Sequence, residues 1–214
     1  HFTKWQPSGN GPLPGDWVRS LFASRDGAIW VGFDGGVVAR IDGANLASFT
    51  LGTSAARGSV LTLAQDSAGV IWAGGENGLH AYDGSRWVDW GPERGVPEST
   101  VYSAFGDRTG VVYVAAGRGI YARQPGRDTF EQLASFGDTF GSFAESPDGR
   151  VWFTDPFYEG AAGDWSHDRS HKELDHDSVY RLEETPAGWS IARVTFDTTR
   201  PNGLLFSPDE KVLY

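Results

Sequence analysis

The sequence predicts an all-β fold assembled from copies of one unit, and two features support this prediction. An aromatic residue that follows a glycine-containing turn recurs at intervals of about forty residues. Its four occurrences are Trp30, Trp72, Tyr113 and Trp152. No segment repeats its apolar residues with the period of a helix. A repeat of this length, divided into short strands, is typical of β-propeller blades. We therefore expect a partial β-propeller with about four complete four-stranded blades and incomplete blades at both ends.

Turns rich in Gly, Asp and Pro divide each repeat into four short strands. In the first repeat the expected strands are Val18–Ala23, Ala28–Phe33, Val37–Ile41 and Leu46–Leu51. The second repeat matches it element for element, with expected strands Val60–Ala64, Val70–Ala73, Gly78–Tyr82 and Trp87–Trp90. A glycine lies at the same distance after the aromatic anchor in three repeats, at Gly36, Gly78 and Gly119. We expect each of these glycines to adopt a positive φ in a tight turn.

The two ends of the chain are expected to be partial blades. Phe2–Trp5 predicts the outer strand of one blade, and Ser207–Tyr214 repeats the pattern of Ser146–Phe153 as far as its second strand. The longer spacing between these last two units places an insertion at Glu159–Ser178. Because the chain starts at His1 and contains no methionine, we expect a fragment whose partners include the missing blades of a longer protein.

Composition excludes several classes of function. The net charge of −10 leaves no excess of Lys and Arg to neutralise phosphates, so we expect no nucleic-acid partner. No apolar run approaches the roughly 18 residues that a membrane span needs. The absence of cysteine excludes disulfides, thiolate metal sites and a cysteine nucleophile. The sequence also lacks a Gly-x-Ser-x-Gly elbow, a phosphate-binding loop and a dinucleotide fingerprint.

The first two thirds of the chain, residues 1–147, contain recurring glycine motifs: Gly27–Gly32 with Gly36, Gly69–Gly74 with Asn77–Leu79, and Gly95–Pro97. With these motifs, this part of the chain resembles the propeller repeats of two-component regulators. The resemblance implies an extracytoplasmic or periplasmic sensor that binds a saccharide and catalyses no reaction.

Residues 148–214 contain three different motifs, Gly149–Tyr158, Ser178–Leu182 and Arg200–Glu210. With these segments, this part of the chain resembles instead the regucalcin/gluconolactonase (senescence marker protein) family. This resemblance implies a six-bladed propeller that acts as a calcium-dependent lactone or ester hydrolase. The two resemblances meet inside one repeat, and we expect them to form one continuous propeller. The hydrolase interpretation is slightly favoured because its motifs are the more specific, and the saccharide sensor is the alternative.

The repeat period identifies one position that each blade would bring to a common channel rim. Leu213 takes the anchor position in the fifth unit. Counting back equally from the four anchors and from Leu213 gives Arg19, Leu61, Tyr102, Gly141 and Asn202. In the resembled hydrolases a glutamate, two asparagines and an aspartate at this rim hold calcium. Asn202 matches one asparagine, whereas Gly141 stands where the other would be. The glutamate has no evident match, and the aspartate would lie beyond Tyr214. We therefore expect this chain to bind calcium, or another divalent cation, poorly and to show no measurable turnover.

Alternatives remain open for each of these residues. Asn202 is either a metal ligand in the longer protein or a turn residue before Gly203. The rim would also suit a sugar, lactone or other small polar ligand, with Tyr102 stacking on it and Arg19 donating to its oxygens. Asp155 either contacts the substrate or accepts hydrogen bonds from backbone amides at a strand end. The insertion carries three histidines, His167, His171 and His176. A solvated loop explains them better than a zinc site, because closed zinc sites usually include cysteine.

Overall fold

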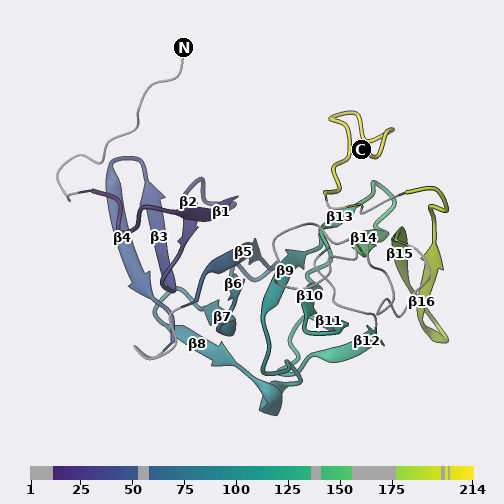
Figure 1. Ribbon diagram of the computed structural model, residues 1–214, viewed down its shortest axis with the longest axis horizontal. Coiled ribbons are helices and arrows are strands. Elements are labelled where there is room, and N and C mark those ends of the chain that lie inside the picture. The colour runs from purple at the N-terminus through teal and green to yellow at the C-terminus, as the bar shows by residue number, and fades with distance from the viewer. Residues whose placement is uncertain (1–11, 53–57, 136–140, 156–176, 199–200, 202) are drawn as a thin grey trace, which may run out of the picture.

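The computed structural model describes residues 12–52, 58–135, 141–155, 177–198, 201 and 203–214. Within these ranges the chain folds into four antiparallel sheets of four strands each (Figure 1). The first sheet contains β1 (Val18–Ala23), β2 (Ile29–Phe33), β3 (Val37–Asp42) and β4 (Asn45–Thr50). The second contains β5 (Val60–Gln65), β6 (Ile71–Gly75), β7 (Gly78–Tyr82) and β8 (Trp87–Trp90). The third contains β9 (Val101–Gly106), β10 (Val112–Ala116), β11 (Gly119–Arg123) and β12 (Glu131–Ser135). The fourth contains β13 (Phe143–Glu145), β14 (Val151–Asp155), β15 (Ser178–Thr185) and β16 (Gly188–Arg193).

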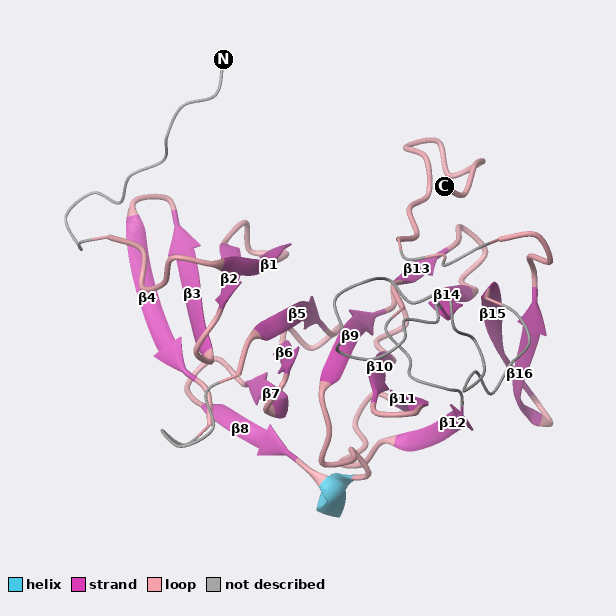
Figure 2. Ribbon diagram, in the orientation of Figure 1, coloured by secondary structure: helices cyan, strands magenta, loops and turns pink. Residues whose placement is uncertain are grey.

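The regular structure of the described residues is almost entirely strand. Figure 2 shows one short helical turn, the 3-10 helix η1 (Pro92–Arg94), between the second and third sheets. No described helix has the length and apolarity needed to cross a membrane. The expectation of an all-β, blade-like architecture is therefore confirmed.

The four sheets follow one another in an open array, and each sheet pairs its strands in chain order. The first strands of successive sheets are neighbours, because β1 contacts β5, β5 contacts β9, and β9 contacts β13. Two hydrogen bonds join these inner strands directly. Ser20 donates its hydroxyl to the Val60 carbonyl at 2.9 Å, and Ala104 donates its N–H to the Thr62 hydroxyl at 3.0 Å. Inner strands side by side are the arrangement expected of propeller blades.

A separate apolar core fills each boundary between neighbouring blades. The boundary between the first two blades buries Trp30, Val38, Leu51, Val60, Leu63 and Ile71. The next boundary buries Trp72, Leu79, Trp90, Val101, Val114 and Phe130. The third boundary buries Tyr113, Ile120, Val151, Phe153, Tyr180 and Leu182. The anchors Trp30, Trp72 and Tyr113 are 2%, 1% and 3% exposed, as expected for structural residues. Trp152 is half-buried and contacts Phe206, because only the short fifth unit follows its blade.

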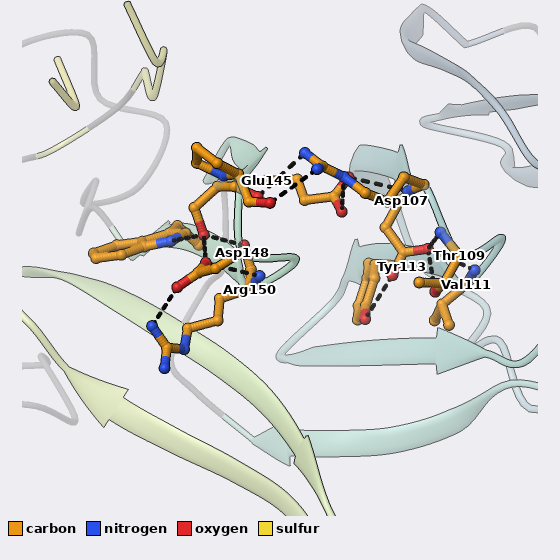
Figure 3. Close-up of polar contacts among 11 residues, drawn as sticks. Asp107, Thr109, Val111, Tyr113, Glu145, Asp148 and Arg150 are labelled. Carbon is orange, nitrogen blue, oxygen red and sulfur yellow. Dashed lines mark hydrogen bonds and ion pairs between the residues drawn. The ribbon is translucent and has the colours of Figure 1, made fainter. Parts of the chain in front are cut away.

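The turn before each anchor repeats the same backbone geometry. The residue that opens the turn accepts a hydrogen bond from the glycine three positions later, as Gly110 donates to Asp107 and Gly149 donates to Ser146. The opening residue is Ser24, Asp66, Asp107, Ser146 or Ser207, and all five are buried. Figure 3 shows the Asp107 carboxylate accepting from the N–H groups of Thr109 and Val111. These hydrogen bonds satisfy the backbone within the turn and fix the direction of the following strand.

The expected strand limits agree with the observed limits to within about two residues, which is the usual uncertainty at strand ends. One expectation is wrong. Gly36 and Gly78 adopt positive φ values of 68° and 90°, but Gly119 does not. In the third blade the positive φ, 54°, is found two residues earlier, at Gly117. In the fifth unit the described residues form a single bridge, Phe206 to Leu213, rather than paired strands. Phe2–Trp5 and the three histidines of the insertion lie outside the described residues.

Candidate functional site

Three of the sequence-predicted rim residues occupy the same structural position in successive blades. Val18 pairs with Phe33 and Ser20 pairs with Gly32, so Arg19 is an extra residue in β1. The same register shift leaves Leu61 unpaired in β5 and Tyr102 unpaired in β9. A β-bulge redirects its side chain and is frequent near binding sites. Because the three inner strands are adjacent, their bulges lie at the same end of neighbouring blades.

Arg19 is held in place by a carboxylate of its own blade. Its Nε and Nη2 donate to Asp34 Oδ1 and Oδ2 at 2.6 and 2.9 Å. The hydrogen bonds from Arg19 and then Ser59 lower the pKa of Asp34 below its usual range, and Asp34 raises the pKa of Arg19. The Arg19 side chain remains 46% exposed. The guanidinium is therefore charged and oriented, with N–H groups left to meet a ligand.

The second blade contributes a continuation of this polar network. Ser59 donates its hydroxyl to Asp34 at 2.7 Å, across the boundary between the first two blades. The Ser59 N–H donates to Glu76 Oε2 at 2.7 Å. Glu76 also contributes to the raised pKa of Arg19, so it lies within electrostatic range of the guanidinium. Sequence reasoning missed Asp34, Ser59 and Glu76. The available signal was that Asp34 and Glu76 lie at the same offset after their anchors, Trp30 and Trp72.

The fourth blade supplies no side chain at the equivalent position. Gly141 precedes β13, and a Cβ atom placed there would overlap the carbonyl oxygen of Thr154. Asp155 ends β14, is 7% exposed, and stands opposite Ser178 of β15. Asp155 is thus buried within the sheet, whereas Arg19 is exposed. Asn202 lies outside the described residues.

The described residues do not form a calcium site by themselves. Calcium requires six to eight oxygen ligands, usually including several carboxylates. Within the described part of the chain no three His, Asp or Glu side chains are grouped closely enough to hold a metal ion. The three bulges carry a guanidinium, an aliphatic chain and a phenol, and Gly141 has no room for a ligand side chain. This set of groups fits a polar organic molecule better than a cation.

Solved structures with similar folds include a lyase, a secretion-system component and the extracellular domain of a two-component system. The virginiamycin B lyase from Staphylococcus aureus matches with a TM-score of 0.67 at 15% identity, over 91% of this chain and 61% of that chain. PorZ, a surface component of the type-IX secretion system of Porphyromonas gingivalis, matches with a TM-score of 0.67 at 14% identity, over 87% of this chain and 28% of that chain. The extracellular domain of a hybrid two-component system from B. thetaiotaomicron matches with a TM-score of 0.57 at 14% identity, over 91% of this chain and 36% of that chain.

These identities are low, so the likenesses establish the fold alone. The chain spans about three fifths of the length of the lyase that it matches. No curated protein sequence matches significantly.

A family model gives the more specific assignment. The model described as the SMP-30/gluconolactonase/LRE-like region matches residues 69–214, which is more than half of the chain. The match begins at the turn before Trp72 and thus includes repeats that also resemble those of two-component regulators. The chain belongs to the SMP-30/gluconolactonase/LRE-like family.

Proposed function

We propose that this chain is the ligand-binding part of an SMP-30/gluconolactonase-like propeller and that it binds a small saccharide or lactone without hydrolysing it. The carrying observation is the bulge repeated in three adjacent inner strands, which presents Arg19, Leu61 and Tyr102 at one end of the blades. Arg19 would donate hydrogen bonds to hydroxyl or carbonyl oxygens. Tyr102 and Leu61 would contact the apolar face of a sugar ring.

We base the proposed absence of hydrolysis on the residues at the rim formed by Arg19, Leu61 and Tyr102. Lactone hydrolysis needs a group that stabilises the developing oxyanion and a group that activates water. Arg19 could stabilise the oxyanion. The carboxylate nearest to it, Asp34, would be the group to activate water, but it already accepts two hydrogen bonds from Arg19. The proposed role of Asp155 is to support β14 rather than to touch the ligand, because its side chain is buried.

Isothermal titration of the purified chain with glucono-δ-lactone and with cellobiose tests binding. We expect Tyr102→Ala and Arg19→Gln each to weaken binding about tenfold, since each removes a direct contact worth about 1–2 kcal/mol. Arg25→Gln, which removes an arginine at the opposite end of the first blade, should leave affinity unchanged. Binding that is insensitive to both rim variants would contradict the proposal. Calcium-dependent hydrolysis of the lactone by this chain, abolished by Asn202→Ala, would contradict the absence of turnover.

The family match favours a second candidate, a metal-dependent lactone or ester hydrolase formed by a longer protein. Asn202 is the residue that we would assign to the metal there. An assay of the product of the full open reading frame, with and without calcium, distinguishes this candidate from a sensor. We also propose an extracytoplasmic location, supported by the fold likeness to an extracellular domain. Protease accessibility in intact cells that carry the full gene tests this location.

A further inference from the structure

A groove lies between the first and second blades, at the end opposite Arg19. It has a volume of about 440 Å³, within the range of small-molecule sites. Its walls include the rings of Trp30, Phe49 and Tyr82. Asp26 and Gly69, in the turns that open at Ser24 and Asp66, border it, whereas Arg19 lies at the start of β1. The groove therefore shares no residue with the proposed rim site, which is formed by Arg19, Leu61 and Tyr102.

The anchor of the first blade lacks the hydrogen bond that its three counterparts make. In the other blades the polar atom of the anchor donates to the opening residue of the turn, with Trp72 to Asp66 at 3.3 Å, Tyr113 to Asp107 at 3.3 Å, and Trp152 to Ser146 at 3.1 Å. Trp30 is 2% exposed, and its Nε1 has no partner among the described residues. A buried N–H without an acceptor is costly, and such groups are rare in folded proteins. Trp30 therefore has an unused donor beside the groove that it lines.

The equivalent space at the next boundary is filled by the protein itself. Arg123 of the third blade corresponds in register to Tyr82 of the second. Its guanidinium lies 5.3 Å from the Trp72 ring and 5.2 Å from the Trp90 ring, and 3.6 Å from the Asp66 carboxylate. At this boundary the anchor and the turn carboxylate both have internal partners. Between the first two blades Tyr82 stands in place of the arginine and Ser24 in place of the aspartate. Trp30 Nε1 makes no hydrogen bond to Ser24, although Trp152 donates to Ser146 at the same position of the fourth blade.

The groove combines aromatic surface with hydrogen-bonding groups of both kinds. The rings of Phe49 and Tyr82 are half-buried, with centroids 5.2 Å apart. Asp26 and Asp83 supply acceptors, because local hydrogen bonds lower the pKa of each to about 2 and keep both ionised at neutral pH. Arg40, whose Nη2 donates to Asp26 at 2.9 Å, supplies donors and would repel a cationic ligand. A sugar has the matching surface, an apolar C–H face bordered by hydroxyls that donate and accept.

We propose that the groove between the first and second blades binds a neutral saccharide unit, stacked on Phe49 and Tyr82, with a hydroxyl accepting from Trp30 Nε1. This groove is separate from the rim site at Arg19 and Tyr102. The chain would thus hold two parts of one glycan, or two sugars, at opposite ends of its first two blades.

Two-dimensional ¹H–¹⁵N NMR of the full chain tests this site through the indole signals, with the Trp30 signal assigned from Trp30→Phe. The probes are glucose, N-acetylglucosamine and cellobiose, each titrated to about 50 mM. We expect at least one of them to shift the Trp30 signal. Arg40→Gln should weaken that response about tenfold, because it removes a charged donor from the groove. The matched control is Arg150→Gln, which removes an arginine paired with Asp148 and Glu183 at the boundary between the third and fourth blades.

Each outcome decides between the two sites. A Trp30 shift that survives Tyr102→Ala and is weakened by Arg40→Gln supports the groove independently of the rim site. A shift lost in Tyr102→Ala but unchanged in Arg40→Gln would overturn the groove proposal and leave the rim site as the sugar site. An unchanged Trp30 signal with all three sugars would also overturn it, as would a response to choline alone. Equal weakening by Arg150→Gln would overturn it because the effect would then not be local.

Discussion

At the scale of single residues, one buried polar side chain organises the turn of every repeat. This residue is Ser or Asp. The Ser24 hydroxyl donates to the Ala28 carbonyl, whereas the Asp66 and Asp107 carboxylates accept from backbone N–H groups of the turns that they open. The glycine three positions later must adopt a left-handed conformation, with φ of 85° at Gly27 and 82° at Gly149. The fifth unit keeps the turn but has Glu210 at this position, with φ of 56°. The backbone geometry of the turn is therefore retained even where the side chain does not favour it.

Gly149→Ala should destabilise the chain by about 1 kcal/mol. No atom lies within 4 Å of the added Cβ, so the cost is the strain of a left-handed alanine rather than a clash. Urea unfolding followed by circular dichroism measures the change. Gly203→Ala is the control, because Gly203 has equal space without a left-handed φ. Equal stability of the two variants would show that the turn does not depend on its glycine.

Asp26 should make the folded state sensitive to acid. Hydrogen bonds from Ser24, Arg40 and the Ala28 N–H lower its pKa in the folded state to about 2. Since the folded pKa lies below the unfolded one, the stabilisation is present above about pH 4 and is lost as the pH falls toward about 2. Between pH 6 and pH 2 the midpoint temperature of thermal unfolding should decline less for Asp26→Asn than for the unchanged chain. Asp16→Asn, at an exposed position, should leave the decline as it was.

At the scale of elements, the repeat pattern predicted the strands and sheets but only part of the site. Strand positions follow from alternating apolar residues and Gly or Asp turns, which are local signals. The shared period also identified Arg19 and Tyr102 as equivalent positions, but not that they form β-bulges. The partners of Arg19 could not be predicted in this way, because the network through Ser59 crosses a blade boundary. Likewise, nothing local to Trp30 shows that its indole lacks an acceptor, because both Trp30 and Trp152 follow a serine by six residues and only Trp152 donates to it.

Neighbouring blades are also joined by an arginine at the turn. The backbone N–H of Arg108 donates to Glu145 of the next blade, and its Nε forms an ion pair with the same carboxylate. Its two Nη atoms donate to the carbonyls of Ser146 and Pro147. Figure 3 places Glu145 beside the turn that begins at Asp107. Arg25 makes the equivalent contacts to Gln65 and to the Asp66 carbonyl. The second blade has Ser67 at this position, and Arg123 joins its boundary instead.

Arg108→Ala should destabilise the chain by about 1 kcal/mol, a modest value because the arginine side chain is half exposed. The loss should be larger at low ionic strength, because the Glu145 pair is weakened by salt screening. Chemical unfolding at two salt concentrations provides the measurement. Arg127→Ala removes the same charge from an exposed loop residue and should change stability little. A larger loss from Arg127→Ala would show that net charge, rather than the contact between blades, controls the effect.

At the scale of the whole molecule, stability depends on contacts between adjacent blades. Each internal boundary buries its own core, and no described core cluster extends over two boundaries. The outer face of the first blade shows the contrast, because Trp17 and Leu21 are 69% and 68% exposed there. Repeat arrays of this kind behave as a sum of unit and nearest-neighbour energies. A core substitution should therefore affect the two blades that share it and leave the others largely unchanged.

The third blade allows a direct test of this nearest-neighbour behaviour. Val114 and Ile120 belong to the same sheet, and both are nearly inaccessible to solvent, at 0% and 1% exposed. Val114 packs against the second blade, and Ile120 packs against the fourth. We expect Val114→Ala to increase hydrogen exchange in β5–β8 and Ile120→Val to increase it in β13–β16, with β9–β12 affected by both. Val114→Ala removes two buried methyl groups and should cost about 2 kcal/mol, whereas Ile120→Val removes one and should cost about 1 kcal/mol. Exchange monitored by mass spectrometry locates the change. A uniform increase across all sixteen strands for either variant would mean that the blades unfold as one unit, because the loss at one boundary would then be shared by the entire array.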